Sequence, residues 1–387
     1  MNVISRAIRK GVYGTLLAIS LSSVSCRQPN ATDKHASPPA AATQLSILTW
    51  SEYLVPEVIE RFEKEAGVTV KVTEVENSDR LIQTLGEKAG AFDIVIADND
   101  SVRRLADLSL LATLDHSKLT HFGQLDPQFV DLWFDPRNRY SVPYLWGATG
   151  FAYHKGRLPG GVDSWDSLWD PKLRGRLAVL DEPIDLQYIA LLSEGKSPET
   201  ALEADFDEAG LKLVEIFSDV EGRMTDCITA IDLLQSGRMD VVMTYGGDAA
   251  QRMESDPNIA FVLPKEGSLL WLDSFVISRD SSAPDLAHQF IDYMTRPEIA
   301  GISSNRLRFA TPNLAARDLL DPDLANDPNL YPQVGCPEKH RFLIFPPENR
   351  RFADRQVIRL FERLREKGLS IDVEQVASHQ PEGTSNL

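Results

Sequence analysis

The 387-residue sequence contains only three cysteines, and its seven histidines form no cluster with the spacing of metal ligands. It has no HExxH or CxxC pattern, no Walker loop, no GxGxxG and no GxSxG. These absences remove the usual sequence signs of a zinc site, a nucleotide site and a nucleophile elbow. We therefore expect no metal, no cofactor and no enzymatic activity.

Positive charge is also scarce in this sequence. It has 40 Lys and Arg against 57 Asp and Glu, which gives a net charge of −17. A surface this acidic repels nucleic acid and anionic lipid, and it concentrates cations nearby. Nucleic acid is therefore not expected as a partner.

Basic residues do gather at the N-terminus, where Arg6, Arg9 and Lys10 are accompanied by no acidic residue. Residues 11–24 are uncharged and apolar in the middle, but they are too few to cross a bilayer as a helix. This pattern predicts a secretory signal over residues 1–25, and hence a protein in the periplasm or elsewhere outside the cytoplasmic membrane. Its removal would leave 362 residues with a net charge of −20, and no run of 18 apolar residues follows it.

The first residue after this segment is Cys26, preceded by the small residues 23–25. The site resembles that of a bacterial lipoprotein, at which the cysteine is acylated, although Leu is usual where this chain has Ser23. Lipidation of Cys26, which would anchor the protein to a membrane, and ordinary cleavage are the two alternatives. Residues 26–43 are rich in Pro, Ala, Ser and Thr and predict a flexible tether.

If Cys26 is acylated, Cys227 and Cys336 are the only cysteines left. In an oxidising compartment, two such residues can form a disulfide. The alternative is two separate buried thiols.

The body of the chain alternates predicted strands and helices. The first series has strands at 44–50, 68–75 and 92–97 and helices at 54–67 and 79–88. The second has strands at 177–180, 239–245, 259–263 and 269–277 and helices at 184–192, 209–217, 228–235 and 284–294. Such alternation is typical of an open parallel α/β sheet, whose ligands bind beyond the carboxyl ends of the strands. A chain of 362 residues exceeds what one core usually organises, so two lobes are expected.

Aromatic residues recur beside carboxylates near the ends of these strands. The sets are Trp50 and Tyr53 with Glu52, Tyr245 with Asp248 and Trp271 with Asp273, while Asp98, Asp100, Glu182 and Asp185 follow two other strands. An aromatic face attracts an alkyl-ammonium group by about 0.5–2 kcal/mol, and a carboxylate offsets the larger cost of burying the charge. The recurrence predicts a ligand with an apolar stem and positive ends, although a single strand-end Asp is more often a helix N-cap and a single Trp more often core.

Seven segments, in order along the chain, resemble the spermidine/putrescine-binding proteins of bacterial polyamine ABC transporters. They are TWSEY (49–53), FDIVIADND (92–100), YSVPYLWGATG (140–150), DSWDSLWDPKLRGRL (163–177), PKEGSLLWLDSFVI (264–277), ATPNLAAR (310–317) and LYP (330–332). The resemblance implies an α/β, two-lobed periplasmic-binding-protein fold of type II. Each lobe is then an open sheet flanked by helices, and crossing strands join the lobes, which close on the ligand. It also implies a substrate-binding component that captures putrescine or spermidine and delivers it to an ABC permease of the inner membrane.

The strand ends and the resemblance together select ten candidate ligand contacts. They are Trp50, Tyr53, Asp98, Asp100, Asp185, Tyr245, Asp248, Trp271, Asp273 and Phe309. By resemblance, Trp50, Tyr53 and Trp271 pack on the polyamine and Asp273 pairs with an amine. Asp248 matches a carboxylate of the putrescine-type members.

The chain departs from the family pattern at several of these positions. Asp98 and Asp100 stand where a Ser and an aromatic are usual, and Tyr245 stands where Trp is usual. Phe309 replaces a common Tyr, and the late Gln of spermidine binders has no aligned counterpart around residues 346–348. The extra carboxylates favour a ligand with more positive charge or tighter amine pairing, or they indicate a changed ligand.

The resemblance also divides the chain into parts. After the signal (1–25) and tether (26–43), lobe 1 comprises 44–147 and 274–325, lobe 2 comprises 148–273, a helical segment on lobe 2 comprises 326–368, and 369–387 is a loose tail. In that helical segment, Val357, Leu360, Phe361 and Leu364 form an apolar stripe. The stripe is expected to dock on a lobe, with a contact to the transporter or membrane as the alternative. Trp165, Leu168 and Trp169 are expected in a core, and the protein is expected to be a monomer.

Three other functions remain open from the sequence. The same fold can bind another small cationic solute. Two cleft carboxylates can serve a hydrolase as acid and base. A sensor can bind a polyamine and report to a membrane partner other than a permease.

Overall fold

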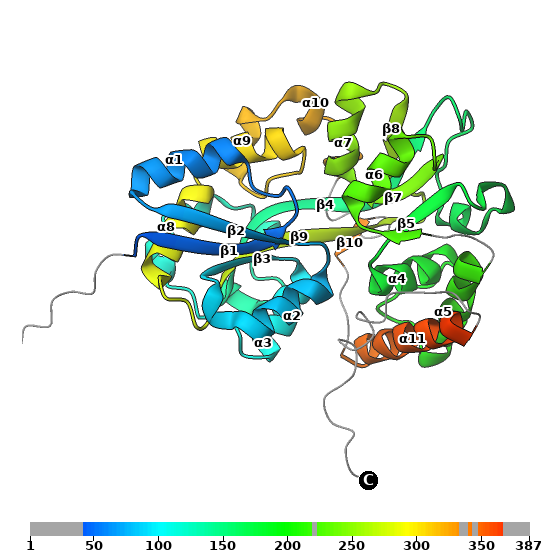
Figure 1. Ribbon diagram of the computed structural model, residues 1–387, viewed down its shortest axis with the longest axis horizontal. Helices are drawn as coiled ribbons and strands as arrows, with labels where there is room; N and C mark the ends of the chain where they lie inside the picture. Colours follow the sequence, from blue (N-terminus) through cyan, green and yellow to red (C-terminus); the bar gives the residue numbers. More distant parts are fainter. Residues whose placement is uncertain (1–41, 219–222, 333–339, 343–346, 367–387) are drawn as a thin grey trace, which may run out of the picture. The chain divides into compact units, whose positions relative to one another are not determined.

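We describe residues 42–218, 223–332, 340–342 and 347–366 of the computed structural model (Figure 1). The predicted signal segment, Cys26, nearly all of the tether, Cys336 and the predicted tail lie outside these ranges. No helix in the described part of the chain is long and apolar enough to cross a membrane.

Ten strands in the described ranges are linked by hydrogen bonds into one sheet. They are β1 (Gln44–Trp50), β2 (Thr69–Val75), β3 (Ile94–Ala97), β4 (Ser141–His154), β5 (Leu177–Leu180), β6 (Arg223–Thr225), β7 (Val241–Tyr245), β8 (Ile259–Val262), β9 (Ser268–Ile277) and β10 (His340–Phe342). Their order is β2-β1-β3-β9-β4-β7-β5-β6, with β10 beside β9 and β8 beside β4. β1 is parallel to β2 and β3, and β5 is parallel to β6 and β7, so two parallel sets flank the β9–β4 pair.

Strands β4 and β9 join the two parallel sets. Residues 141–148 of β4 pair antiparallel with β9, and residues 149–154 pair antiparallel with β7 and β8. Residues 274–277 of β9 pair antiparallel with β3. The predicted α/β fold with strands that cross between two halves is therefore confirmed, whereas the exact lobe boundaries stay a prediction.

Helices cover both faces of each parallel set (Figure 1). In the described residues they are α1 (Pro56–Ala66), α2 (Ser78–Lys88), α3 (Asn99–Asp107), α4 (Pro183–Ser193), α5 (Glu203–Ser218), α6 (Cys227–Gln235), α7 (Gly246–Ser255), α8 (Pro284–Met294), α9 (Pro297–Leu307), α10 (Pro322–Ala325) and α11 (Pro347–Glu366). The first set packs α1, α8 and α9 on one face and α2 and α3 on the other. The second set packs α6 and α7 on one face and α4, α5 and α11 on the other.

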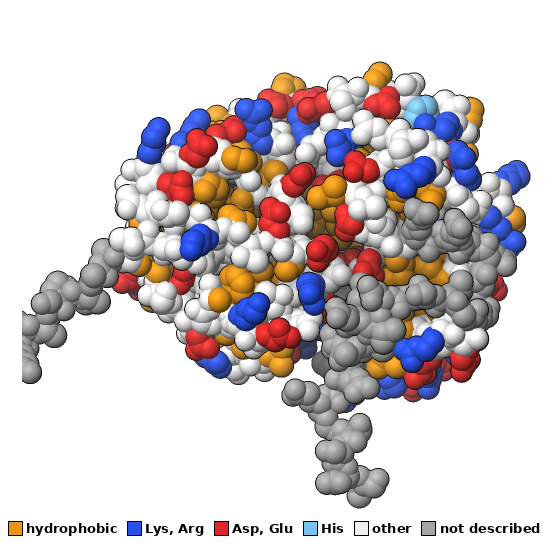
Figure 2. All heavy atoms as spheres, viewed as in Figure 1, with side chains coloured by type: hydrophobic (Ala, Val, Ile, Leu, Met, Phe, Trp, Pro, Cys, Tyr) orange, Lys and Arg blue, Asp and Glu red, His pale blue; other side chains and the backbone are white. Residues whose placement is uncertain are grey.

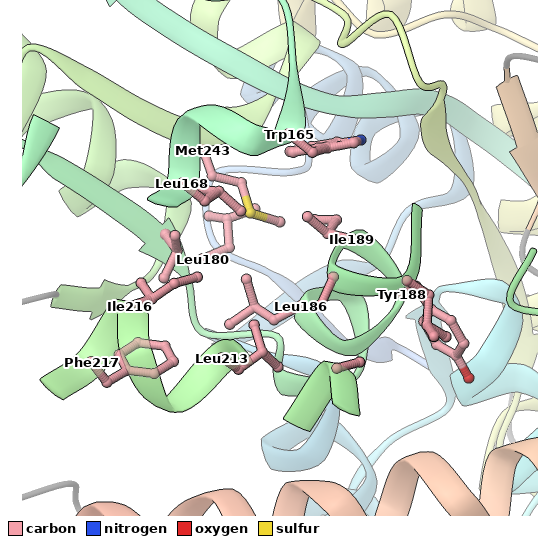
Figure 3. Packing of buried hydrophobic residues seen from close by; sticks show 14 of the residues in the cluster. Trp165, Leu168, Leu180, Leu186, Tyr188, Ile189, Leu213, Ile216, Phe217 and Met243 are labelled. Carbon is pink, nitrogen blue, oxygen red and sulfur yellow. The ribbon is translucent and has the colours of Figure 1, made fainter. Parts of the chain in front are cut away.

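The core of the second set confirms two predictions about apolar residues. Trp165 and Leu168 are buried near Met243 of β7 and Ile189 of α4 (Figure 3). Trp169 is half-buried, and its indole N–H donates to the Lys212 carbonyl at 2.9 Å. The apolar stripe of α11 is buried as well, so this helix docks on α4 and α5, as expected.

The sequence pattern missed β4 as a strand and did not identify helices α3, α7 and α9. β4 contains a proline and two glycines, and it is buried on both faces, so its sequence lacks the alternation of a half-exposed strand. Helix α7 begins with Gly246 and Gly247, and glycine is a poor helix former. Tertiary packing supplies the stability that local propensity does not.

Leu360→Ala is expected to lower the free energy of unfolding by about 2–5 kcal/mol, because it leaves a cavity beneath α11. Glu362→Ala, at an exposed position of the same helix, is the matched control and should change it by less than about 0.5 kcal/mol. Urea denaturation followed by circular dichroism measures both. Equal effects of the two substitutions would show that α11 is not docked in solution.

Candidate ligand-binding site

A cavity of about 170 Å³ lies where the carboxyl ends of the parallel strands approach β9. Trp50 ends β1, Asp98 follows β3, Glu182 follows β5 and Tyr245 ends β7. Asp and Glu side chains gather around a hollow in the middle of the face shown in Figure 2, and hydrophobic side chains lie at its floor. The position is the one at which open α/β sheets bind ligands.

All ten candidate residues from the sequence line this one cavity. They are Trp50, Tyr53, Asp98, Asp100, Asp185, Tyr245, Asp248, Trp271, Asp273 and Phe309. The chain positions span 260 residues, and the crossing strand β9 brings its Trp271 and Asp273 to the strand ends of both sets. Direct contact of each residue with a ligand stays a prediction.

The aromatic side chains form a continuous series of ring contacts along the cavity. The Tyr245 and Trp271 centroids are 5.5 Å apart, those of Trp271 and Phe309 are 5.2 Å apart, and those of Phe309 and Tyr53 are 5.6 Å apart. The first two contacts are edge-to-face and the third is tilted, and such ring packing holds each side chain in place. The exposed faces and edges of such a series provide an apolar wall for an alkyl chain.

Two glycines make room for these rings. A Cβ atom at Gly147 of β4 would lie 2.5 Å from the Trp271 ring, and one at Gly247 of α7 would lie 2.3 Å from the Phe309 ring. Both distances are too short for a real contact, so only glycine fits. The sequence contains both glycines, but it does not indicate which aromatic rings lie against them.

Asp273, in β9, is the most deeply buried carboxylate of the cavity, with 4% of its surface exposed. Burial raises the pKa of its carboxyl to about 7, and the charge of Asp98 acts in the same direction. The Tyr53 hydroxyl and Trp50 indole N–H favour the ionised form without offsetting the burial. Among the described residues the donors that support this carboxylate are neutral, and a cation would complete its environment.

Asp248, in the first turn of α7, is the second such carboxylate. Burial raises its pKa to about 7, and the Cys227 thiol opposes this shift by donating to it. Its Oδ2 atom is buried and has no hydrogen-bond partner in the described ranges. An ammonium group is the kind of donor that would satisfy it.

Cys227 thus lies in the cavity wall and is unpaired among the described residues. Burial raises the pKa of its thiol well above the usual value, and Asp248 adds to the shift. Its predicted partner, Cys336, falls outside the described residues, so the disulfide stays a prediction.

A second group of carboxylates lies at the start of α4. Burial raises the pKa of Asp185 to about 7, and Asp98 and Asp100 contribute in the same direction. Burial also raises the pKa of Glu182 well above its usual value, with Asp185 as the next cause. Two neighbouring acidic groups disfavour each other's ionised form, and a positive charge placed between them would favour the ionised form of both.

Asp98 acts as the N-cap of α3, the structural alternative weighed from the sequence. Its Oδ1 accepts from the backbone N–H of Asp100 at 2.9 Å and of Ser101 at 3.0 Å. Its Oδ2 accepts from the Ser101 hydroxyl at 2.5 Å and from the Ser78 hydroxyl at 3.0 Å. Because its four acceptor positions are filled, we expect Asp98 to act on a ligand through its charge.

Asp100 forms an ion pair with Arg350, a cavity residue that sequence reasoning missed. Arg350 lies in the first turns of α11, just after the segment that could not be aligned with the family. The sequence contains only an indirect sign of this residue, because residues 346–348 just before it could not be aligned with the family. Nothing local in the sequence indicates that this arginine pairs with an aspartate 250 residues away in the chain.

The cavity lining is strongly acidic. It contains nine carboxylates and two arginines, of which Arg104 pairs with Asp79 at 2.9 Å. No group of His, Cys, Asp and Glu within the described ranges is arranged to hold a metal ion. Because Asp79 and Asp100 are paired and Asp98 caps α3, the candidates to pair with an organic cation are Glu182, Asp185, Asp248 and Asp273.

A mixed α/β fold with crossing strands, whose strand ends surround a small acidic and aromatic cavity, defines a binding protein for a small solute. The chain belongs to the bacterial extracellular solute-binding proteins, whose family model matches residues 57–332. Membership agrees with the predicted export and with the expectation that this protein is not an enzyme, and it gives no support to the hydrolase alternative. The fold is the two-lobed fold of periplasmic binding proteins.

Two named relatives are similar over most of their length. The spermidine/putrescine-binding periplasmic protein of Escherichia coli is 32% identical over 292 residues, covering 75% of this chain and 83% of the relative. The putrescine-binding periplasmic protein PotF of the same organism is 27% identical over 341 residues, covering 83% of this chain and 88% of the relative.

Two solved structures share the fold. A protein of Listeria monocytogenes has a TM-score of 0.76 at 29% identity, covering 83% of this chain and 99% of its own. The spermidine/putrescine ABC transporter substrate-binding protein PotD of Streptococcus pneumoniae has a TM-score of 0.70 at 25% identity, covering 84% of this chain and 99% of its own.

The raised pKa of Asp273 makes a prediction about the ligand-free protein. Its pKa is 3.8 in an unfolded chain and about 7 when folded, so the native state holds a proton that the unfolded state has lost between these values. The unfolding free energy therefore falls as the pH rises from about 4 to 7, by up to about 4 kcal/mol from this group. Asp273→Asn should flatten this pH dependence and raise stability at pH 8.

Urea denaturation of ligand-free protein at pH 5.5 and pH 8 measures the effect. Asp318→Asn, at an exposed position, is the matched control and should retain the wild-type pH profile. An Asp273→Asn profile that coincides with wild type would show that this carboxylate is not buried in the free protein.

Proposed function

We propose that this protein is the substrate-binding component of a polyamine ABC transporter, which captures putrescine or spermidine and delivers it to a permease. The observation that carries the proposal is a cavity lined both by a series of aromatic rings and by carboxylates that have raised pKa values and no ion-pair partner among the described residues. The relatives named above bind spermidine or putrescine according to their names, and other relatives are named for agmatine and cadaverine.

The chemistry of the cavity matches the chemistry of a polyamine at each end. One ammonium group would pair with Asp273 and Asp248, and another would pair with Asp185 and Glu182. The methylene chain between them would lie against the rings of Trp271, among others. Each cation–π contact contributes about 0.5–2 kcal/mol, but charge pairing dominates because a buried unpaired charge costs several kcal/mol.

The size of the cavity also supports a small ligand. Its volume of about 170 Å³ is below the roughly 300–1,000 Å³ of pockets for drug-sized molecules. Ligand contacts come from strand ends of both parallel sets and from β9. A bound polyamine would therefore favour a closed form of the two-lobed fold through its higher affinity for that form.

Calorimetric titration of ligand-stripped protein with putrescine and spermidine tests the proposal. We expect binding of at least one polyamine, and Asp273→Asn should weaken it by about 3–5 kcal/mol, because a buried ammonium loses its partner. N-acetylputrescine, which lacks one positive end, is the matched ligand control and should bind far more weakly. Absence of heat with every polyamine would refute the proposal in favour of another cationic solute, which native mass spectrometry of gently purified protein would identify.

The same carboxylates predict that binding releases protons at neutral pH. In the free protein Asp185, Asp248 and Asp273 each have a pKa of about 7, so they are partly protonated at pH 7. Ammonium groups favour the ionised form and lower these pKa values on binding. Affinity should therefore fall as the pH decreases below 7, by up to about tenfold per pH unit for each carboxylate.

Titrations at pH 7 in phosphate and in Tris measure proton release, because the two buffers differ in ionisation enthalpy. We expect different observed enthalpies in the two buffers, and weaker binding at pH 5.5 than at pH 8. Equal enthalpies in both buffers would show that the carboxylates are already ionised before the ligand arrives.

A further inference from the structure

The cavity contains a positive charge of its own at one end. Arg350, in α11, forms an ion pair with Asp100 of α3, and its side chain is 17% exposed. It also pairs with Asp354, one turn further along α11, at 2.9 Å. Arg350 therefore connects the helix that covers the second parallel set with the strand-end region of the first.

The guanidinium is surrounded by acidic groups from every element near it. Asp100 comes from α3 and Asp354 from α11 itself, and Asp185 and Tyr188 of α4 are close enough to interact with its charge. Arg350 thus occupies the place that a ligand ammonium would take against Asp100. Asp273 has no ion-pair partner among the described residues, and the groups that favour its ionised form are the neutral Tyr53 hydroxyl and Trp50 indole N–H.

The position of Arg350 is fixed before any ligand binds. Asp354 holds the guanidinium from the same helix, and the buried side chains of Val357 and Leu360 hold α11 on its partners. A charge placed in this way cannot move aside without breaking both ion pairs. A third ammonium group of a ligand would meet it at short range, and like charges brought together oppose binding.

We propose that Arg350 is a specificity-determining residue, which neutralises Asp100 in place of a ligand ammonium and thereby matches the cavity to a diamine rather than a triamine. This inference rests on the proposed polyamine-binding function and deepens it. In the resulting arrangement, Asp273 and Asp248 take one end of the diamine, and Asp185 and Glu182 take the other.

Calorimetry with putrescine and spermidine on four variants tests the assignment. Arg350→Gln removes the internal cation and should raise the preference for spermidine over putrescine at least about tenfold. Asp100→Asn removes the carboxylate that the guanidinium neutralises in the cavity, leaves its pair with Asp354, and should shift the preference toward putrescine. Arg350→Lys, which keeps the charge, should stay near the wild-type ratio. Arg359→Gln, also in α11, should stay near the wild-type ratio as well, because it loses only an exposed pair with Asp207 of α5.

The outcomes separate this inference from the function on which it rests. Wild-type protein that binds neither polyamine would refute both. Wild-type protein that binds a polyamine, with an unchanged ratio in folded Arg350→Gln and Asp100→Asn, would refute only the role of Arg350. Thermal unfolding of each variant shows whether it is folded. If Arg350→Gln does not fold, Asp100→Asn supplies the test.

Discussion

The burial of carboxylates without a cationic partner is the constraint on which this site depends. Asp273 and Asp248 lie against aromatic rings in a cavity where water cannot solvate their charge, and their pKa values rise to about 7 in consequence. Such groups weaken the folded state at neutral pH and persist only where they have a use. In the proposed function that use is the binding of a cation, because a ligand ammonium would offset the same desolvation that burial imposes on the carboxylate.

The fold meets this constraint with two crossing strands and two sets of strand ends. Parallel strands bring their carboxyl ends to one place, and helices that begin there supply N-caps such as Asp98. β9 adds Trp271 and Asp273 from the middle of a strand, where β4 pairs with it on one side and the Asn99 side chain accepts from the Leu272 N–H on the other. Gly147 and Gly247 let the rings lie directly against the backbone. Ring positions are thus fixed by main-chain packing, and the cavity is largely formed in advance.

Much of the site was predictable because its residues stand at recognisable places in the sequence. Trp50, Asp98 and Tyr245 each mark the end of a strand, and the segment around Trp271 and Asp273 is typical of the family. The role of Asp98 was less certain, since the same position suits an N-cap or a ligand contact, and the hydrogen bonds of the structure favour the cap. β4 was missed because a strand buried on both faces has no alternating pattern.

The sequence by itself determined the class of protein, the α/β alternation, the acidic character and the set of aromatic and carboxylate residues that line the cavity. These follow from local patterns and from a resemblance spread along the chain. Only the tertiary structure decided which of these carboxylates lack a partner and which already have one. Arg350 belongs to α11, and its pair with Asp100 depends on the docking of that helix. Charge compensation in a buried site depends on distances between residues far apart in the chain, and no local pattern carries that information.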